Sequence, residues 1–250
     1  MTTRSTLRAG DAAVEVLARA GVRRFYTVPG ESFLEVIDAV EEHPALELVS
    51  TRHESGASFM AEAEAKLTGV PAVAMATRGV GASNLAIGVH TAMQDSTPMV
   101  VLLGHVETHF LGREAFQEVD LAAFYAPITK WAVTVHSADR VAEFVERGLR
   151  IATSGRPGPV MLALPADLLG EGVPVQDTLA GAPRPVRPLP SAEEVQSVAR
   201  KLSEAQRPVM IAGGGAGHAR DELLALAEAF EVGVYAAFRR QDVFPNEHPL

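Results

Sequence analysis

Cysteine does not occur in the 250-residue sequence, which excludes a disulfide framework, a thiolate metal site and a cysteine nucleophile. No stretch is long enough to cross a bilayer, because the longest apolar runs, such as residues 98–103, fall far short of the roughly 20 residues that a spanning helix needs. The first ten residues are polar and lack the apolar core of a signal sequence. We therefore expect a cytoplasmic protein that does not enter a membrane.

Basic residues are also scarce, with 22 Lys and Arg against 31 Asp and Glu and a formal net charge of −9. No run of Lys and Arg reverses this balance locally. Because nucleic-acid binding depends on cationic side chains that neutralise phosphates, the composition argues against nucleic acid as a partner. Hydrophobic residues make up 47% of the chain, which is typical of a globular protein with a core of normal size.

Residues 1–168 alternate short apolar runs with helical patterns. The expected strands are 25–28, 46–50, 73–76, 99–103 and 160–164, and the expected helices are 11–20, 32–42, 56–67, 83–93 and 138–152. Strands that are apolar throughout, each followed by a helix, indicate a parallel sheet with helices on both faces. The pattern predicts an α/β domain, interrupted by a less regular stretch before residue 138.

Prolines then become frequent, and they predict an extended linker over residues 169–190. A second, Rossmann-like α/β unit begins at residue 191, where Ser191 and Glu194 have the spacing of a helix capping box. Its expected elements are strands at 209–212 and 232–236 around a turn at 213–217 and a helix at 220–230. Because this pattern stops within a domain, we expect residues 1–250 to be part of a longer protein.

Three junctions between a strand and a helix are candidate ligand sites, because ligands in open parallel sheets bind beyond the carboxyl ends of the strands. In the first, Gly30 lets the backbone approach a ligand closely. In the second, Glu54 precedes a helix built from small residues. In the third, Gly79 and Gly81 stand at the head of a helix, where glycines can cradle a phosphate. Each junction taken alone is explained at least as well by an ordinary turn or helix start.

A later glycine-rich segment, residues 213–217, leaves a nucleotide-binding oxidoreductase open as an interpretation. That interpretation needs an acidic residue at the end of a strand about 20 positions later, whereas Glu231 precedes its strand. A permissive turn explains the same glycines. His90 and His105 are isolated, and no pair of histidines with a carboxylate has the spacing of a metal site.

In their order along the chain, the junctions resemble the pyrimidine-binding domain of thiamine-diphosphate-dependent enzymes. The matching segments are Val28-Pro29-Gly30, Arg52-His53-Glu54-Ser55-Gly56-Ala57 and Ala76-Thr77-Arg78-Gly79-Val80-Gly81-Ala82-Ser83-Asn84. Residues 94–98, 114–118 and 153–160 are similar to the acetolactate synthase branch. The resemblance extends from about residue 10 to residue 250, and residues 191–250 resemble the opening of the family's central domain.

The resemblance implies an activity and a set of site residues. Glu54 would hydrogen-bond the ring nitrogen N1′ of the aminopyrimidine and so activate thiamine diphosphate for attack on a 2-oxo acid such as pyruvate. The residues implied at the pyrimidine pocket are Pro29, Gly30, Gly81 and Asn84, and those implied near the substrate are Phe116 and Gln117.

The resemblance also implies partners and further cofactors. Pyrimidine and diphosphate domains come from different subunits in this family, so we expect a homodimer or homotetramer. The ligands of Mg²⁺ and the diphosphate belong to a C-terminal domain with a Gly-Asp-Gly signature, which residues 1–250 lack. We therefore expect this segment by itself to be inactive. True acetolactate synthases often bind FAD through the central domain, and residues 191–250 leave FAD binding open.

Three positions depart from the family pattern. Many relatives have serine where Arg78 stands, proline where Val80 stands and glutamine where His105 stands. Since Arg78 and His105 could reach the rim of the active site, the substrate and acceptor stay open. A 2-oxo acid decarboxylase, or another thiamine-diphosphate lyase or acetyltransferase, is the alternative activity. A non-catalytic scaffold is a third interpretation, and the presence of Glu54 in its glycine-rich context counts against it.

Overall fold

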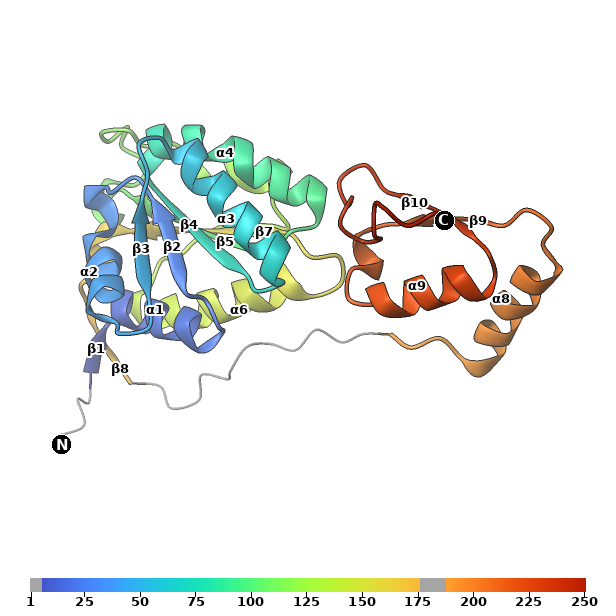
Figure 1. The fold of residues 1–250 in the computed structure, drawn as a ribbon. Coiled ribbons are helices and arrows are strands. Elements are labelled where there is room, and N and C mark those ends of the chain that lie inside the picture. Colours follow the sequence, from blue (N-terminus) through green and yellow to red (C-terminus); the bar gives the residue numbers. More distant parts are fainter. Residues whose placement is uncertain (1–5, 176–187) are drawn as a thin grey trace. The chain divides into compact units, whose positions relative to one another are not determined.

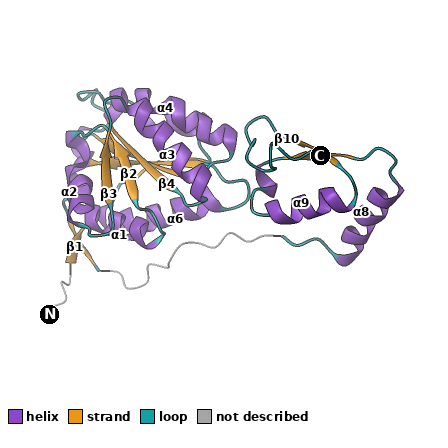
Figure 2. Ribbon diagram, in the orientation of Figure 1, coloured by secondary structure: helices purple, strands orange, loops and turns teal. Residues whose placement is uncertain are grey.

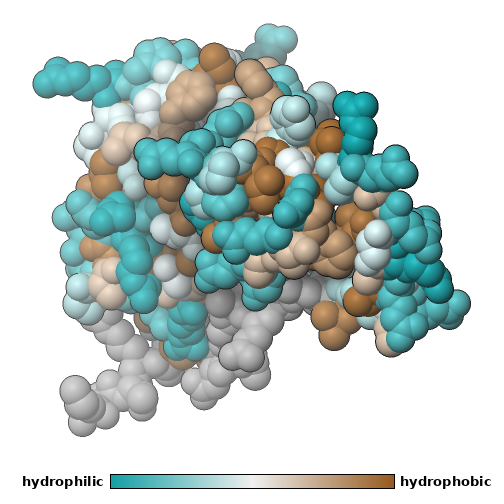
Figure 3. All heavy atoms as spheres, turned by 45° about the vertical axis from the view of Figure 1, so that its right-hand side comes forward, coloured by the Kyte–Doolittle hydropathy of each residue, from teal (hydrophilic) through white to brown (hydrophobic). Residues whose placement is uncertain are grey.

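The computed structural model describes residues 6–175 and 188–250. The chain divides into two compact units, residues 1–186 and residues 187–250. Within the described residues, no helix combines the length and the apolar character that crossing a membrane requires. On the face drawn in Figure 3, apolar side chains are scattered among polar ones.

A six-stranded parallel sheet forms the centre of the first unit (Figure 1). Its strand order is β3-β2-β4-β5-β7-β6, and every neighbouring pair is parallel. The strands are β2 (Arg24–Thr27), β3 (Glu47–Ser50), β4 (Ala72–Thr77), β5 (Met99–His105), β6 (Trp131–Thr134) and β7 (Pro159–Pro165). Together with the flanking helices, this sheet confirms the predicted α/β class.

Helices cover both faces of this sheet (Figure 2). On one face lie α1 (Ala9–Arg19), α2 (Leu34–Glu42), α6 (Val141–Thr153) and α7 (Ala166–Leu169), and on the other lie α3 (Glu54–Thr68), α4 (Arg78–Asp95) and α5 (Leu121–Tyr125). Side chains alternate along each strand, so Met75 packs into the first core and Ala74 into the second. Strands β5 and β7 are buried along their whole length, as their unbroken apolar runs predict.

Two helices begin earlier than the sequence predicts. Helix α3 starts at Glu54 instead of residue 56, and α4 starts at Arg78 instead of residue 83. The glycines of the third junction, Gly79 and Gly81, indicated a loop, because glycine has a low helix propensity. In the structure, Gly79 is helical, and a Cβ there would lie 2.5 Å from Cγ1 of Val119. Close packing against Val119 therefore outweighs the low helix propensity of Gly79.

The stretch without a regular pattern contains several short elements. They are α5, β6 and the 3-10 helices η2 (Thr108–Phe110) and η3 (Ala126–Ile128), followed by η4 (Ala138–Arg140) before α6. Strand β6 lies at the edge of the sheet, and all four of its residues are half-buried. An edge strand of this kind lacks the continuous apolar run that revealed the central strands, which explains why the sequence did not predict it.

The beginning of the predicted linker belongs to the first unit. Strand β8 (Gly172–Pro174) pairs antiparallel with β1 (Thr6–Arg8), so both ends of this unit meet in a small second sheet. Residues 176–187, which hold the middle of the predicted linker, lie outside the described residues.

The second unit contains the predicted parallel strands and intervening helix. Its elements are α8 (Ala192–Glu204), β9 (Val209–Ala212), η5 (Gly214–Ala216), α9 (Arg220–Ala229) and β10 (Gly233–Ala236). Strands β9 and β10 are parallel neighbours. The capping box is also present, because Ser191 N donates to Glu194 Oε2 at 2.7 Å and Glu194 N donates to Ser191 Oγ at 3.2 Å. This arrangement matches the predicted opening of a second α/β unit.

Candidate active site

The three predicted junctions meet at one edge of the large sheet. Strands β2, β3 and β4 end there in register, since Thr27 pairs with Ser50 on one side and with Met75 on the other. Strand β5 ends at the same edge, where Gly104 pairs with Thr77. The parallel topology therefore brings together loops that are far apart in sequence, at the position where open α/β sheets bind ligands.

Glu54 is held at this edge by α4. Its Oε2 accepts a hydrogen bond of 2.9 Å from Nδ2 of Asn84. Its Oε1 lies beside Gly81, where an added Cβ would stand 3.3 Å away. The structure thus brings three of the predicted site residues into direct contact, and the absence of a side chain at Gly81 makes room for the carboxylate.

The local structure around Glu54 suits a negative charge. His53 is extended and caps α3, with its Nδ1 accepting a hydrogen bond of 3.2 Å from Ser55 N. Glu54 is the first residue of the 15-residue helix, where the helix dipole favours an anion. Its side chain is half-buried, so the favourable field is only partly screened by solvent.

The turn after β2 packs tightly against the start of α4. A Cβ at Gly30 would lie only 2.6 Å from Cβ of Thr77, so a side chain there would displace the turn. Next along the chain, Ser32 Oγ and Thr77 Oγ1 are 2.7 Å apart. Pro29 is exposed beside this contact. The structure therefore places Pro29 and Gly30 next to the α4 terminus that carries the predicted pocket residues.

The predicted substrate residues lie in the loop before α5. Phe116 is exposed, and Gln117 has a positive φ of 61° while its carbonyl accepts a hydrogen bond of 3.0 Å from Gly79 N. The carboxylate of Glu118 accepts hydrogen bonds from Ala115 N at 2.9 Å and Gly112 N at 2.6 Å, and these bonds lower its pKa. The loop is thus held in shape and fixed to the first turn of α4.

Two buried basic residues stand beside these predicted positions. Arg78 forms an ion pair of 2.9 Å with Glu31 and places its guanidinium 5.7 Å from the ring centre of Phe116. His105 ends β5, and burial lowers the pKa of its imidazole. The sequence marked both as departures from a family pattern that could reach the rim of the active site. It did not predict their burial, or the contacts of Arg78 with Glu31 and Phe116, because these depend on elements far away in the chain.

The arrangement fits an aminopyrimidine on chemical grounds. A carboxylate has about four acceptor positions, and the amide of Asn84 occupies one of those on Glu54. No Lys, Arg or His in residues 6–175 and 188–250 forms an ion pair with Glu54, so its charge is not neutralised by a cation. Glu54 can therefore accept a hydrogen bond from a protonated ring nitrogen. Asn84 and Gly81 fix the orientation of its carboxylate.

Residues 7–124 match the thiamine pyrophosphate enzyme N-terminal TPP binding domain, and residues 195–250 match the central domain of the same enzymes. The chain is 34% identical over 255 residues to a probable acetolactate synthase large subunit of Methanocaldococcus jannaschii, covering 98% of this chain and 42% of the relative. It is 33% identical over 248 residues to the acetolactate synthase isozyme 1 large subunit of Escherichia coli, covering 99% of this chain and 44% of the relative.

A third relative, the chloroplastic acetolactate synthase 2 of Zea mays, is 34% identical over 247 residues, which are 97% of this chain and 39% of that protein. The chain thus spans less than half the length of these relatives. The two domain models match in the order expected for these enzymes, and the alignments with acetolactate synthases cover nearly the whole chain. The chain therefore belongs to the thiamine pyrophosphate enzyme family.

Proposed function

We propose that the full protein is a thiamine-diphosphate-dependent carboligase that acts on a 2-oxo acid such as pyruvate, as an acetolactate synthase does. The observation that supports this function best is the placement of Glu54 beside Gly81 and Asn84 at the carboxyl edge of the sheet. The similarity to acetolactate synthases favours this activity over a nucleotide-binding oxidoreductase. A simple 2-oxo acid decarboxylase is the alternative within the same family.

In this proposal, each site residue has a separate task. Thiamine diphosphate, when bound, supplies the carbon nucleophile and the electron sink for loss of carbon dioxide from a 2-oxo acid. Glu54 accepts the hydrogen bond from N1′ of the aminopyrimidine and so governs where the ring carries its proton. Asn84 keeps the carboxylate turned toward the ring, and Gly81 leaves the space for both. Pro29 and Gly30 border the ring.

The loop before α5 forms the substrate side of the proposed site. Phe116 offers an exposed aromatic face, and Gln117 is fixed by the hydrogen bond between its carbonyl and the first turn of α4. A loop whose backbone is fixed in this way can present its side chains to a substrate without losing much further conformational entropy. We propose that these two residues border the carbonyl compound that reacts.

We further propose that the active site is completed by a second copy of the chain, in a homodimer or homotetramer. Helices α3 and α4, which carry Glu54 and Asn84, expose large apolar side chains at Phe59, Met60, Leu67, Val80 and Ile87. An apolar surface of this kind is typical of a protein interface. The residues that hold Mg²⁺ and the diphosphate would then lie outside residues 1–250. FAD binding and a cytoplasmic location stay predictions.

The decisive experiment measures which product the full-length protein forms from pyruvate. We expect acetolactate to accumulate only when both thiamine diphosphate and Mg²⁺ are added. Acetaldehyde as the main product would favour the decarboxylase instead. Turnover that is independent of thiamine diphosphate would contradict both, and pyruvate reduction coupled to NADH would support the oxidoreductase.

A further inference from the structure

Arg78 is a buried cation whose hydrogen-bonding capacity is not used up. The residue is only 8% exposed, and its Nε has no hydrogen-bond partner among the described residues. Its Nη1 pairs with Oε1 of Glu31 at 2.9 Å. A buried donor without a partner costs stability, and such a group in a native protein calls for a functional explanation.

The backbone at Arg78 is also unusual. Its φ of +46° lies in the left-handed region, which is unfavourable for a residue with a Cβ. Glycine would adopt this conformation without the cost. The unfavourable φ at the head of α4 points the buried guanidinium toward the turn after β2 and the loop before α5, where Glu31 and Phe116 contact it. Strain that persists in this way is typical of a binding or catalytic position.

The partner of Arg78 is a carboxylate that is easily displaced. The side chain of Glu31 is 69% exposed, whereas that of Arg78 is 10% exposed. Water can solvate the carboxylate of Glu31 when it leaves the pair, but the buried guanidinium then needs another anion to compensate its charge. The planar guanidinium can bind a carboxylate through two parallel N–H donors, and a side-on contact of this kind would use the free Nε together with Nη2.

The position of Arg78 connects this free donor to the proposed reaction. Arg78 is the first residue of α4 and Gly81 lies in the same first turn, and Gly81 adjoins the Glu54 carboxylate. His105 follows Gly104, which pairs with Thr77, and its buried Nδ1 also has no hydrogen-bond partner among the residues described. The Arg78 guanidinium and the His105 imidazole thus each have a buried nitrogen without a partner among the described residues, at the ends of adjacent strands next to the proposed cofactor position.

We propose that Arg78 binds the carboxylate of an incoming 2-oxo acid, and that Glu31 occupies the guanidinium until this anion replaces it. His105 lies beside this subsite as a second donor. The inference rests on the proposed function for the identity of the anion, because a 2-oxo acid carries its carboxylate directly next to the reacting carbonyl. It makes Arg78 a specificity-determining residue that favours anionic over neutral carbonyl compounds.

Pyruvate binding to the cofactor-free full-length protein tests this proposal without any turnover. In calorimetric titrations we expect Arg78→Gly, which also relieves the positive φ, to weaken pyruvate binding at least tenfold. Arg78→Lys should weaken it less, because charge is kept and the bidentate geometry is lost. The neutral ester methyl pyruvate should bind all three proteins equally. Equal pyruvate affinity in the wild type and Arg78→Gly, including no detectable binding by either, overturns the proposal.

The Glu31→Gln variant gives the sharper test, because the expected sign is opposite to that of a structural role. If Glu31 competes with the substrate, Glu31→Gln binds pyruvate more tightly, by a factor of about three or more. Glu41→Gln, an exposed position on α2, is the matched control, since it removes the same charge away from Arg78. Pyruvate binding in Glu31→Gln that is equal to or weaker than in Glu41→Gln would show that Glu31 does not compete with the substrate, and would overturn the proposal.

A parallel assay separates this inference from the proposed function. With thiamine diphosphate and Mg²⁺ present, Arg78→Gly should raise KM for pyruvate at least tenfold while kcat changes less. A wild-type protein that binds pyruvate through Arg78 but does not turn it over would contradict the proposed carboligase and leave the carboxylate subsite standing.

Discussion

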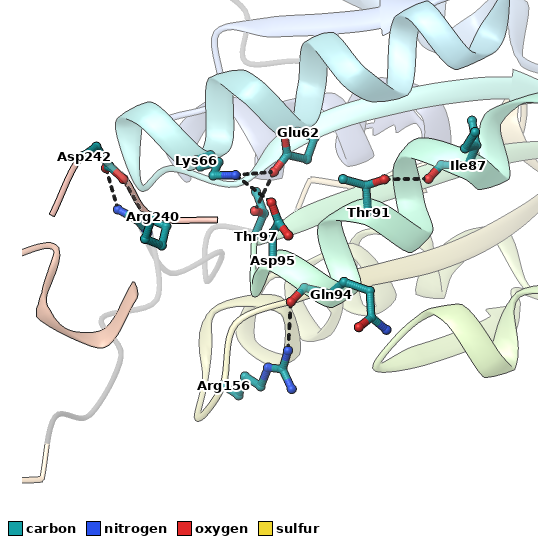
Figure 4. A network of polar contacts seen from close by, with 10 residues as sticks. All are labelled: Glu62, Lys66, Ile87, Thr91, Gln94, Asp95, Thr97, Arg156, Arg240 and Asp242. Atoms are coloured by element: carbon teal, nitrogen blue, oxygen red, sulfur yellow. Dashed lines mark hydrogen bonds and ion pairs between the residues drawn. The ribbon is translucent and has the colours of Figure 1, made fainter. Parts of the chain in front are cut away.

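Helix α3 carries two carboxylates that face α4, and the structure treats them in opposite ways. Glu54, at the first residue, is half-buried and has a neutral amide as its partner, Nδ2 of Asn84. Glu62, eight residues later, is only 7% exposed. Its Oε1 accepts a hydrogen bond of 3.0 Å from Thr97 Oγ1 and lies 3.8 Å from Nζ of Lys66 (Figure 4).

Cationic side chains complete the polar network around the far end of α4. Lys66 Nζ contacts Oδ2 of Asp95 at 2.6 Å, and Arg156 donates to the carbonyl of Gln94 at 3.1 Å (Figure 4). Arg156 also donates to Oγ of Ser96 at 2.7 Å. The Gln94–Ser96 and Arg156 segments, which both resembled acetolactate synthases in sequence, thus meet in space. This end of the helix pair is held by compensated charges.

The difference teaches how to separate a structural carboxylate from a reactive one on the same helix. The charge of a carboxylate paired with a cation is already compensated, and breaking such a pair destabilises the fold. A carboxylate oriented by an amide is fixed in space but keeps its charge and its capacity to accept another proton donor. This criterion assigns Glu62 a structural role and supports the proposal that Glu54 acts on the cofactor.

The largest expected effect comes from Glu54→Gln. Glutamine keeps the size of the side chain and can still accept from Asn84, but it cannot take part in proton transfer. We expect pyruvate turnover by the full-length protein with its cofactors to fall by at least about 100-fold, the scale of a positioned proton-transfer group. The midpoint of thermal unfolding should stay close to that of the wild type. Near-normal turnover would remove Glu54 from the mechanism.

The converse substitution acts at the other end of α3. Lys66→Met leaves Glu62 and Asp95 close together without the cation that separates them. Because Lys66 is itself 26% exposed, we expect a loss of about 2 kcal/mol in the free energy of unfolding, below the 3–5 kcal/mol of a fully buried pair. Denaturant titration measures this loss. Turnover should change less than twofold at a temperature where the variant is folded. A larger change would show that the Lys66 end of α3 also contributes to activity.

A smaller effect is expected where α5 supports the proposed reactive end. The hydroxyl of buried Tyr125 donates to the carbonyl of Ala82 at 2.6 Å, one residue after Gly81. Tyr125→Phe should cost about 1 kcal/mol in unfolding free energy, the usual contribution of one hydrogen bond. If the first turns of α4 need this support to orient Asn84, turnover also falls, by a few-fold. Unchanged stability would show that the hydroxyl contributes nothing to the position of α4.

The smallest effect concerns the pH dependence of stability through His105. Burial lowers the pKa of His105, partly offset by Glu118 and Asp120 and reinforced by Arg78 and His136. The unfolded chain therefore binds a proton at this position more readily than the folded chain. Stability from the neutral imidazole is present above the unfolded pKa of about 6.5 and is lost as the pH falls through the folded value.

Unfolding titrations of the wild type and His105→Gln at pH 7.5 and pH 5 measure this contribution. We expect the variant to lose less stability than the wild type between the two values, since glutamine does not titrate. An equal or greater loss in the variant would show that His105 is already protonated in the folded protein, or that other groups dominate this range.

Much of the proposed reactive end could be predicted from the sequence, because its residues stand at the ends of recognisable strands. Gly30, Glu54 and Gly81 follow three apolar runs, and parallel strands bring such positions to one edge. The contribution of Arg78 and its partner Glu31 could not be predicted in this way. Their contact joins the turn after β2 to the head of α4, and the burial of Arg78 depends on a loop from a third part of the chain.

The sequence by itself determined the alternation of apolar strands and helices, the capping box at Ser191 and the order of the three junctions. These features are local, because they depend on periodicity and on residues within a few positions of one another. Only the tertiary structure decided that Glu54 meets the amide of Asn84, that Glu62 meets the hydroxyl of Thr97, and that Gly79 is helical. Those outcomes depend on which side chains and loops of distant elements pack against α3 and α4. The pattern of residues within one element contains no such information.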